Sequence, residues 1–213
     1  MAETGAGQEA VQDQRADLPV ADREVLHHGK VFDLVGERVD LGAGGEVYRE
    51  FLAHPGAVAV VALDDAGRVA LVRQYRHPVR AYLWEVPAGL LDVPGEPLLA
   101  AAQRELAEEA DLHAATWHTL VDFCTTPGGS DERIRIFLAR DLTAVPEADR
   151  FAREAEELEM PLSWVDLDEA HAAVLAGQIH NPSAVAGILA AHAARCAGWQ
   201  PLRAADAPDP LPR

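Results

Sequence analysis

Three glutamates in one short stretch, Glu105, Glu108 and Glu109, have the spacing best suited to chemistry in this 213-residue chain. On a helix, at about 100° per residue, their side chains share an arc of about 100°. Three like charges about 5–6 Å apart repel one another unless a counterion lies between them. A hard divalent cation such as Mg²⁺ or Mn²⁺ accepts several carboxylate oxygens as ligands. The spacing therefore indicates either a metal site or an acidic helix face in water.

A longer pattern around these glutamates resembles the Nudix box, the signature of the Nudix family. Gly89, Glu96 and residues 104–112 follow the form G-x5-E-x7-R-E-U-x-E-E-x-G-U, where U is aliphatic, with two departures. Six residues instead of five separate Gly89 from Glu96, and Asp111 replaces the last glycine. Aspartate tolerates the left-handed conformation that ends a helix, and neither departure removes a carboxylate.

The resemblance implies a strand–loop–helix–loop unit within an α/β/α sandwich that hydrolyses nucleoside diphosphates linked to another moiety. It implies that Mg²⁺, or Mn²⁺ as a substitute, is held by Glu105, Glu108, Glu109 and the backbone carbonyl of Ala88. Glu109 counts as catalytic for the same reason. Arg104 would hold the carboxylates in place by charge-assisted hydrogen bonds. Glu96 would support the junction between loop and helix.

Motifs outside the box resemble the ADP-ribose pyrophosphatase branch of the family. Residues 84–89 read WEVPAG, residues 126–128 read TPG, and Pro127 lies 16 residues after Asp111. A small β domain ahead of the core also fits, because enzymes of this branch are typically dimers that exchange such a domain. The resemblance therefore implies a homodimer that hydrolyses ADP-ribose to AMP and ribose 5-phosphate.

The remaining site residues are also implied by the resemblance. The branch takes its general base from a loop after the core strands, which points to Glu156 or Glu157 in the acidic stretch 153–160, with the choice open. Arg49 and Arg76 lie in segments resembling those that place arginines on the diphosphate and nucleotide, where a guanidinium binds phosphate oxygens in pairs. The other candidates for substrate contact are Glu85, Arg104 and, in the terminal-ribose pocket, Ser130, Asp131 and Glu132. A surface ion pair is the alternative for each.

The charge and hydropathy of the chain exclude some partners. Eighteen basic against 35 acidic residues give a formal net charge of −17, which repels nucleic acids and acidic membrane surfaces. The longest apolar run, 57–63, is far shorter than the roughly 20 residues that span a bilayer. The start of the chain lacks the pattern of a secretory signal. We therefore expect a cytoplasmic protein that acts on a small molecule.

The order of the expected elements gives the fold class, α/β, with a mixed sheet packed between helices and a small N-terminal antiparallel β domain. Short strands are expected within 25–51, and longer or buried ones at 57–63, 69–72, 117–123, 134–139 and 163–165. Helices are expected through the box, at 167–176 and from Asn181 to about Arg195. The expected divisions are a flexible tail (1–20), the β domain (21–55), the Nudix domain (56–197) and a second flexible tail (198–213).

Three other functions are compatible with parts of this pattern. A Nudix hydrolase could act on NADH, an ADP-sugar or GDP-mannose, because substrate choice depends on pocket shape. A non-catalytic regulator that senses ADP-ribose is disfavoured, since such proteins commonly lose box glutamates and gain a DNA-binding domain. A structural cation-binding protein is disfavoured by the spacing of Gly89 and Arg104.

Overall fold

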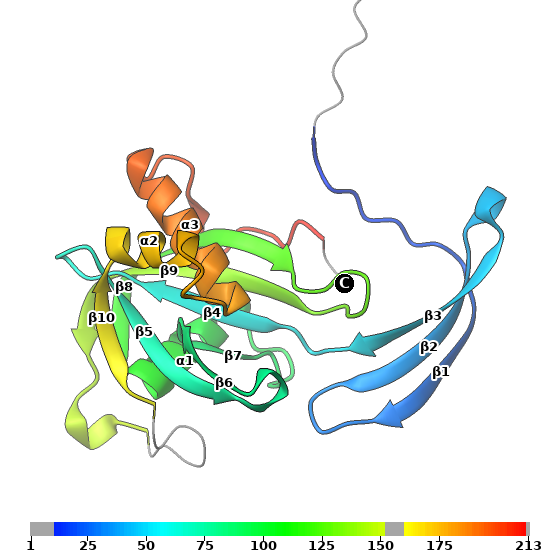
Figure 1. Cartoon of the computed structure of the whole chain (residues 1–213), viewed down its shortest axis with the longest axis horizontal. Helices are drawn as coiled ribbons and strands as arrows, with labels where there is room; N and C mark the ends of the chain where they lie inside the picture. The colour runs from blue at the N-terminus through cyan, green and yellow to red at the C-terminus, as the bar shows by residue number, and fades with distance from the viewer. Residues whose placement is uncertain (1–10, 152–159, 212–213) are drawn as a thin grey trace, which may run out of the picture.

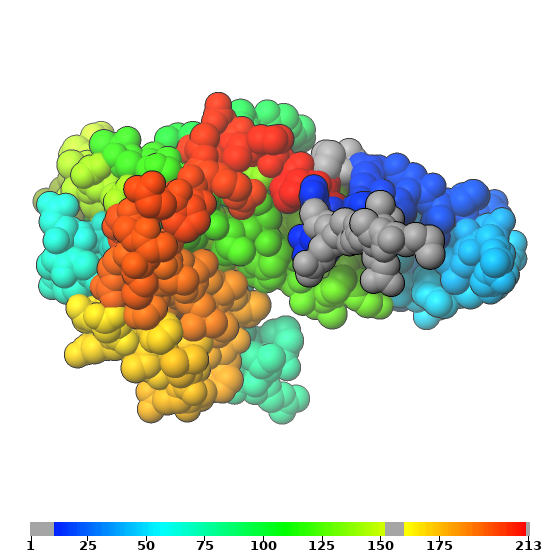
Figure 2. Space-filling model, turned by 90° about the horizontal axis from the view of Figure 1, so that it is seen from above, coloured from blue at the N-terminus to red at the C-terminus, as the bar shows by residue number. Residues whose placement is uncertain are grey.

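The computed structural model describes residues 11–151 and 160–211. Its N-terminal part is an antiparallel sheet in the order β1-β2-β3, which projects from the body of the molecule (Figures 1 and 2). The strands are β1 (Val20–His28), β2 (Asp33–Asp40) and β3 (Glu46–Ala53). The turn between β2 and β3 has φ of +65° at Gly42 and +77° at Gly45, which glycine adopts without strain. The expected strands within 25–51 correspond to this sheet. All nine residues of β1 are exposed. Because neither face of β1 is buried, its sequence does not show the alternation of apolar and polar residues that marks a half-buried strand.

A mixed five-stranded sheet forms the centre of the body, in the order β11-β8-β9-β4-β7. Its strands are β4 (Ala57–Ala62), β7 (Ala88–Leu90), β8 (Leu112–Cys124), β9 (Arg133–Ala144) and β11 (Arg203–Ala204). β4 runs parallel to β9, and the other neighbours are antiparallel. A further antiparallel sheet contains β5 (Arg68–Arg76), β6 (Ala81–Glu85) and β10 (Leu162–Asp166). All six residues of β4 are buried, as expected for a strand covered on both faces.

Helices cover both faces of the central sheet (Figure 1). α1 (Leu98–Ala110) packs through Leu106 on one face, against Val58 and Phe137 among others. α2 (Leu167–Leu175) and α3 (Pro182–Cys196) pack on the other face. At Gly187 in α3 an added Cβ would lie 2.8 Å from Val61 Cγ2, so glycine permits this close approach. The expected α/β/α sandwich with a mixed sheet and a preceding β sheet is confirmed.

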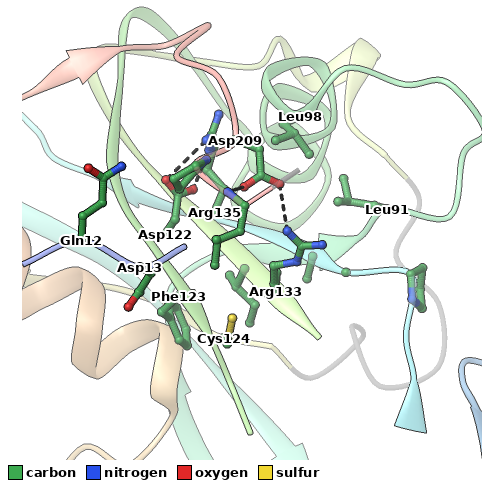
Figure 3. Close-up of a pocket in the computed structure, with 16 residues that line it drawn as sticks. Gln12, Asp13, Leu91, Leu98, Asp122, Phe123, Cys124, Arg133, Arg135 and Asp209 are labelled. Carbon is green, nitrogen blue, oxygen red and sulfur yellow. Dashed lines mark hydrogen bonds and ion pairs between the residues drawn. The ribbon is translucent and has the colours of Figure 1, made fainter. Parts of the chain in front are cut away.

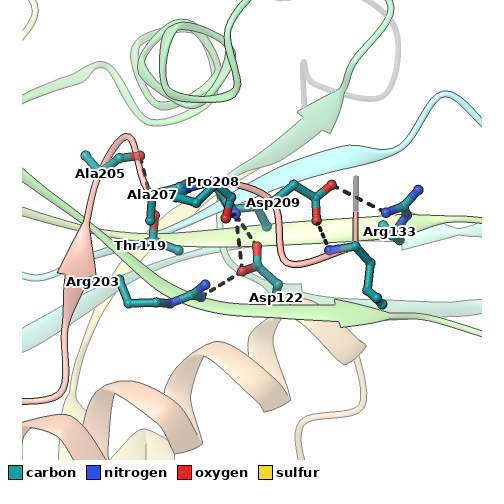
Figure 4. Close-up of polar contacts among 10 residues, drawn as sticks. Thr119, Asp122, Arg133, Arg203, Ala205, Ala207, Pro208 and Asp209 are labelled. Carbon is teal, nitrogen blue, oxygen red and sulfur yellow. Dashed lines mark hydrogen bonds and ion pairs between the residues drawn. The ribbon is translucent and has the colours of Figure 1, made fainter. Parts of the chain in front are cut away.

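The C-terminal segment differs from the flexible tail expected from residue 198 onward. β11 pairs with β8, and the following residues lie along β8 and β9 (Figure 4). Arg135, which is 6% exposed, donates hydrogen bonds to Asp122 and to the carbonyls of Ala207 (2.6 Å) and Pro208 (3.1 Å). A buried guanidinium needs such partners. Arg135 is far from the C-terminal segment in the sequence. The composition of that segment alone therefore does not show that it is held against the sheet.

The helices of residues 11–151 and 160–211 are all too short or too polar to cross a membrane.

Candidate active site

The helix that carries the three glutamates is held by its apolar side and by its end. On the helical wheel Ala102, Leu106 and Ala110 share the arc next to that of the glutamates, and all three are buried against the sheet. The helix ends at Asp111 with φ +53°, and the Asp111 N–H donates to the carbonyl of Leu106. The left-handed conformation expected at the position of the last box glycine is therefore present, with aspartate in place of glycine.

Strand β7 supports two of the three carboxylates. The backbone N–H of Ala88 donates a hydrogen bond of 2.9 Å to Glu109. Glu105 lies directly over Gly89, where an added Cβ would be 2.0 Å from the Glu105 carboxyl carbon. Only glycine leaves room for the side chain of Glu105 at this point. The glycine at position 89 thus has a steric reason.

Arg104 joins the carboxylates to one another. Its Nε and Nη2 donate to the two oxygens of Glu96, at 3.2 and 3.0 Å. Its Nη1 donates to Glu105 and, at 3.3 Å, to Glu108. Through these contacts Arg104 would position the carboxylates, and this role stays a prediction.

The loop between β7 and α1 has one residue more than the Nudix box, and Glu96 still pairs with Arg104. The loop makes a turn in which the Glu96 N–H donates to the carbonyl of Val93 at 3.1 Å. Gly95 occupies this turn with φ +77°. The turn still presents the Glu96 carboxylate to Arg104, at the junction where the sequence predicts a supporting role.

The electrostatics of this cluster follow from burial and pairing. Burial raises the pKa of Glu105, which is 9% exposed, and the nearby Arg104 partly opposes that shift. Hydrogen bonds from Arg104 lower the pKa of Glu96. The same bonds raise the pKa of Arg104, which stays charged. The guanidinium of Arg104 is therefore a permanent positive charge between two carboxylates, Glu96 and Glu105, whose pKa values are shifted in opposite directions.

The donor set suits a hard divalent cation, because it consists of carboxylate and carbonyl oxygens beside a strand without a side chain at Gly89. Within residues 11–151 and 160–211, however, no three His, Cys, Asp or Glu side chains are arranged to hold a metal ion. Arg104 instead bridges Glu105 and Glu108. The assignment of the three carboxylates as metal ligands stays a prediction.

Two further predicted residues pair with each other. Glu85, at the end of β6, is 2% exposed, and both its oxygens accept hydrogen bonds from Arg76, at 2.8 and 2.7 Å. This bidentate geometry is typical of a strong arginine–carboxylate pair. Glu85 lies three residues before Ala88 and holds the guanidinium of Arg76. Contact of either residue with substrate stays a prediction.

The other predicted substrate contacts come from β3 and from the loop between β8 and β9. Arg49 is exposed on β3, and its Nη1 donates to the carbonyl of Tyr48 at 3.0 Å. Ser130, Asp131 and Glu132 follow the turn between β8 and β9, beside the end of β3. The Ser130 hydroxyl donates to the carbonyl of Leu52, at 3.2 Å. These contacts fix the loop against β3, and a ribose pocket there stays a prediction.

Comparison with known proteins identifies the family. The NUDIX domain family model matches residues 53–184, more than half of the chain. The chain belongs to the Nudix family. It is 46% identical over 185 residues to an ADP-ribose pyrophosphatase of Mycobacterium tuberculosis, covering 87% of this chain and 88% of that protein. It is 37% identical to an ADP-ribose pyrophosphatase of Bacillus subtilis, covering 75% and 84% of the two chains.

A solved structure shares the fold of this Nudix protein. It is a crystal structure of an ADP compounds hydrolase, with a TM-score of 0.70 and 21% sequence identity. The likeness covers 88% of this chain and 99% of that chain, so it includes most of the described elements.

Two predicted residues of the Nudix site cannot be placed. Glu156 and Glu157, the candidates for the general base, lie outside the described residues.

The sequence did not indicate a cavity of about 440 Å³ beside the start of α1 (Figure 3). Its lining combines Leu91 and Leu98 from around the Nudix loop with Cys124 at the end of β8 and Asp209 from the C-terminal segment. Residues far apart in the sequence form this cavity, so no local signal could have found it. His54, which contacts the loop after β8, was also missed, since it is a single histidine in a short connection.

Proposed function

We propose that this Nudix protein hydrolyses the pyrophosphate bond of ADP-ribose to give AMP and ribose 5-phosphate, with Mg²⁺ as cofactor. The observation that carries the proposal is the cluster of Glu105, Glu108 and Glu109 around Arg104 and β7. Relatives at 46% and 37% identity are ADP-ribose pyrophosphatases, which supports this substrate. Members of the Nudix family generally use a divalent metal, which supports the cofactor.

The roles proposed for the residues in the cluster come from the Nudix box that these residues match. Glu105, Glu108 and Glu109 would bind the cation, with the carbonyl of Ala88 as a further ligand. Mn²⁺ has the same preference for oxygen ligands and could substitute for Mg²⁺. Arg104, held by Glu96, would keep the carboxylates in position when the substrate enters. A residue that contacts a metal ligand in this way orients the ligand and is needed for full activity.

The reaction requires water, a base and charge neutralisation. A water oxygen forms a bond to one phosphorus, the bond from that phosphorus to the bridging oxygen breaks, and the bridging oxygen leaves with the electron pair. When bound, the divalent cation neutralises the diphosphate and makes water more acidic. Glu156 or Glu157 would take the proton of the water. Arg76 and Arg49 would bind the phosphates, and residues 130–132 would contact the terminal ribose.

A substrate panel tests the proposal directly. ADP-ribose, NADH, an ADP-sugar and GDP-mannose are each incubated with the protein and Mg²⁺, and the products are separated by chromatography. We expect ADP-ribose to give AMP and ribose 5-phosphate with the highest kcat/KM. Preference for another of these substrates would make that compound the substrate of the site. Binding of ADP-ribose without turnover would instead indicate a sensor.

We also propose that the protein forms a homodimer through its N-terminal sheet. The exposed apolar side chains of this sheet and its turns support the dimer: Val20, Val25, Leu26, Phe32 and Tyr48. A three-stranded sheet that leaves such residues in water has little packing to stabilise it. Light scattering coupled to size-exclusion chromatography should give twice the mass of 22.9 kDa. A mass of one chain at micromolar concentration would contradict the dimer.

The cytoplasmic location expected from the sequence belongs to the same proposal. Cell fractionation followed by immunoblotting tests it, and recovery of the protein in the membrane or secreted fraction would contradict it. The net charge of −17 supports a small-molecule substrate over nucleic acid.

A further inference from the structure

The connection between the N-terminal sheet and the central sheet consists of three residues, His54, Pro55 and Gly56, between β3 and β4. β3 and β4 belong to different sheets. The orientation of the N-terminal sheet therefore depends on the contacts made around this connection. Residues 125–132, which we call the β8–β9 loop, make many of the contacts to the end of β3 and to this connection.

The β8–β9 loop is hydrogen-bonded to the end of β3 on both sides of Leu52. The Leu52 N–H donates to the carbonyl of Gly129 at 3.0 Å, and the Asp131 N–H donates to the Leu52 carbonyl at 3.1 Å. Leu52 and Ser130 thereby form a parallel bridge. These main-chain bonds attach β3 to the Nudix domain independently of the connection itself.

His54 makes three polar contacts at the same place. Its backbone N–H donates to Asp131 Oδ1 at 2.7 Å, and its Nδ1 accepts from the Gly56 N–H at 3.0 Å. Because Nδ1 is an acceptor, the ring hydrogen of the neutral imidazole lies on Nε2. Nε2 is 3.6 Å from Glu132 Oε1, while the other oxygen of Glu132 accepts from the Thr125 hydroxyl at 2.7 Å. The imidazole is mostly buried, and these contacts hold it in one orientation.

The contacts of His54 continue to the carboxylate site through the backbone. The Gly56 carbonyl accepts a hydrogen bond of 3.0 Å from the Leu91 N–H, directly after β7. β7 in turn carries Ala88, which binds Glu109, and Gly89, which makes room for Glu105. The ring of Phe32, from the N-terminal sheet, stacks on His54 with centroids 6.4 Å apart. His54, through its ring and its backbone, thus contacts Phe32, the β8–β9 loop and Gly56. The carbonyl of Gly56 is in turn bonded to Leu91 after β7.

We propose that His54 is a positioning residue for the carboxylate site. Its Nδ1 holds Gly56, and through Gly56 it sets where β7 ends and where the loop into α1 begins. Asp131 and Glu132 orient His54 in this arrangement. The kinetic part of the inference rests on the proposed function, whereas the structural part stands on the hydrogen bonds alone.

Two substitutions separate the roles of the ring nitrogens. His54→Asn places an amide oxygen near the position of Nδ1 and keeps an acceptor for the Gly56 N–H. His54→Gln places its polar atoms near Nε2 and loses that acceptor. His28→Gln is the matched control, because His28 is an exposed histidine of β1 whose ring pairs with Asp33. Amide hydrogen exchange at Gly56 and Leu91 is measured by NMR, and kcat and KM are measured with ADP-ribose and Mg²⁺.

We expect His54→Gln to speed exchange at both amides about tenfold and to lower kcat at least about tenfold, with KM little changed. His54→Asn should stay within about threefold of the wild type in exchange and in kcat, as should His28→Gln. Wild-type exchange in His54→Gln, or equal losses in the two His54 variants, would overturn the proposal. If the wild type does not hydrolyse ADP-ribose, the proposed function fails, and the exchange rates alone still decide the structural part of the proposal, that His54 holds Gly56 and Leu91 in place.

Discussion

Gly89 shows how one residue without a side chain permits the arrangement of the glutamates. A Cβ at this position would lie 2.0 Å from the carboxyl carbon of Glu105, so Gly89→Ala must displace Glu105 or β7. A misplacement of about 1 Å at a reacting group lowers the rate about 100-fold. We therefore expect kcat for ADP-ribose to fall about 100-fold, with an overpacking penalty of about 1–3 kcal/mol in the free energy of unfolding.

The matched control is Gly129→Ala, because an added Cβ there meets nothing within 4 Å. Steady-state kinetics and urea unfolding of both variants separate the steric effect from the loss of glycine itself. Full kcat in Gly89→Ala would show that Glu105 need not lie where the structure places it.

The general base is the second question at the scale of residues. If one of Glu156 and Glu157 takes the proton from water, its change to glutamine removes the base without changing its shape. We expect one of the two variants to lose about 100-fold or more in kcat and the other to stay within a few-fold of the wild type. Equal and mild losses in both, measured with saturating Mg²⁺, would place the base elsewhere.

At the scale of elements, the pair of Glu96 and Arg104 attaches the loop to α1 and should make stability depend on pH. Hydrogen bonds from Arg104 lower the pKa of Glu96 from its model-compound value of 4.5. The unfolded chain therefore binds more protons between the folded and unfolded pKa values. The contribution of this pair is fully present above the unfolded pKa and is lost as the pH falls through the folded pKa.

Urea unfolding of the wild type and Glu96→Gln between pH 3 and pH 6, with a chelator present, measures this contribution. We expect the two unfolding free energies to differ most at pH 6 and to converge as the pH falls through the lowered pKa of Glu96. A difference that stays constant over the whole range would mean that the Glu96 carboxylate does not interact with Arg104 in solution.

The elements also show what a sequence can and cannot predict. The position of α1, its buried side and its left-handed end at Asp111 were predictable, because helical periodicity and end signals are local. β1 was not predicted at its full length, because exposed strands carry no alternation. The shared arc of the three carboxylates was predicted from the helical wheel, which cannot show that Arg104 bridges two of them.

At the scale of the whole molecule, the contacts that the sequence could not predict join segments far apart in the chain. Arg135 holds the C-terminal segment, and His54 contacts both the β8–β9 loop and Gly56. Such contacts depend on the packing of the sheet against its helices, and single-sequence patterns contain little information about them. The net charge of −17 further means that the molecule repels a diphosphate unless cations lie between them. The proposed activity therefore depends on the carboxylates of α1 as a cation site.

The most direct test of this dependence is the release of AMP from ADP-ribose by the wild type and by Glu109→Gln over a range of Mg²⁺ concentrations. Glutamine keeps an oxygen that can accept the Ala88 N–H but removes the charge. Glu169→Gln, at the exposed first turn of α2, is the control for loss of one negative charge. We predict that Glu109→Gln folds normally and loses about 1,000-fold or more in Mg²⁺-dependent turnover, as when an essential transition-state interaction is removed. Wild-type turnover in Glu109→Gln, at the same Mg²⁺ concentrations, would contradict the assignment of the site.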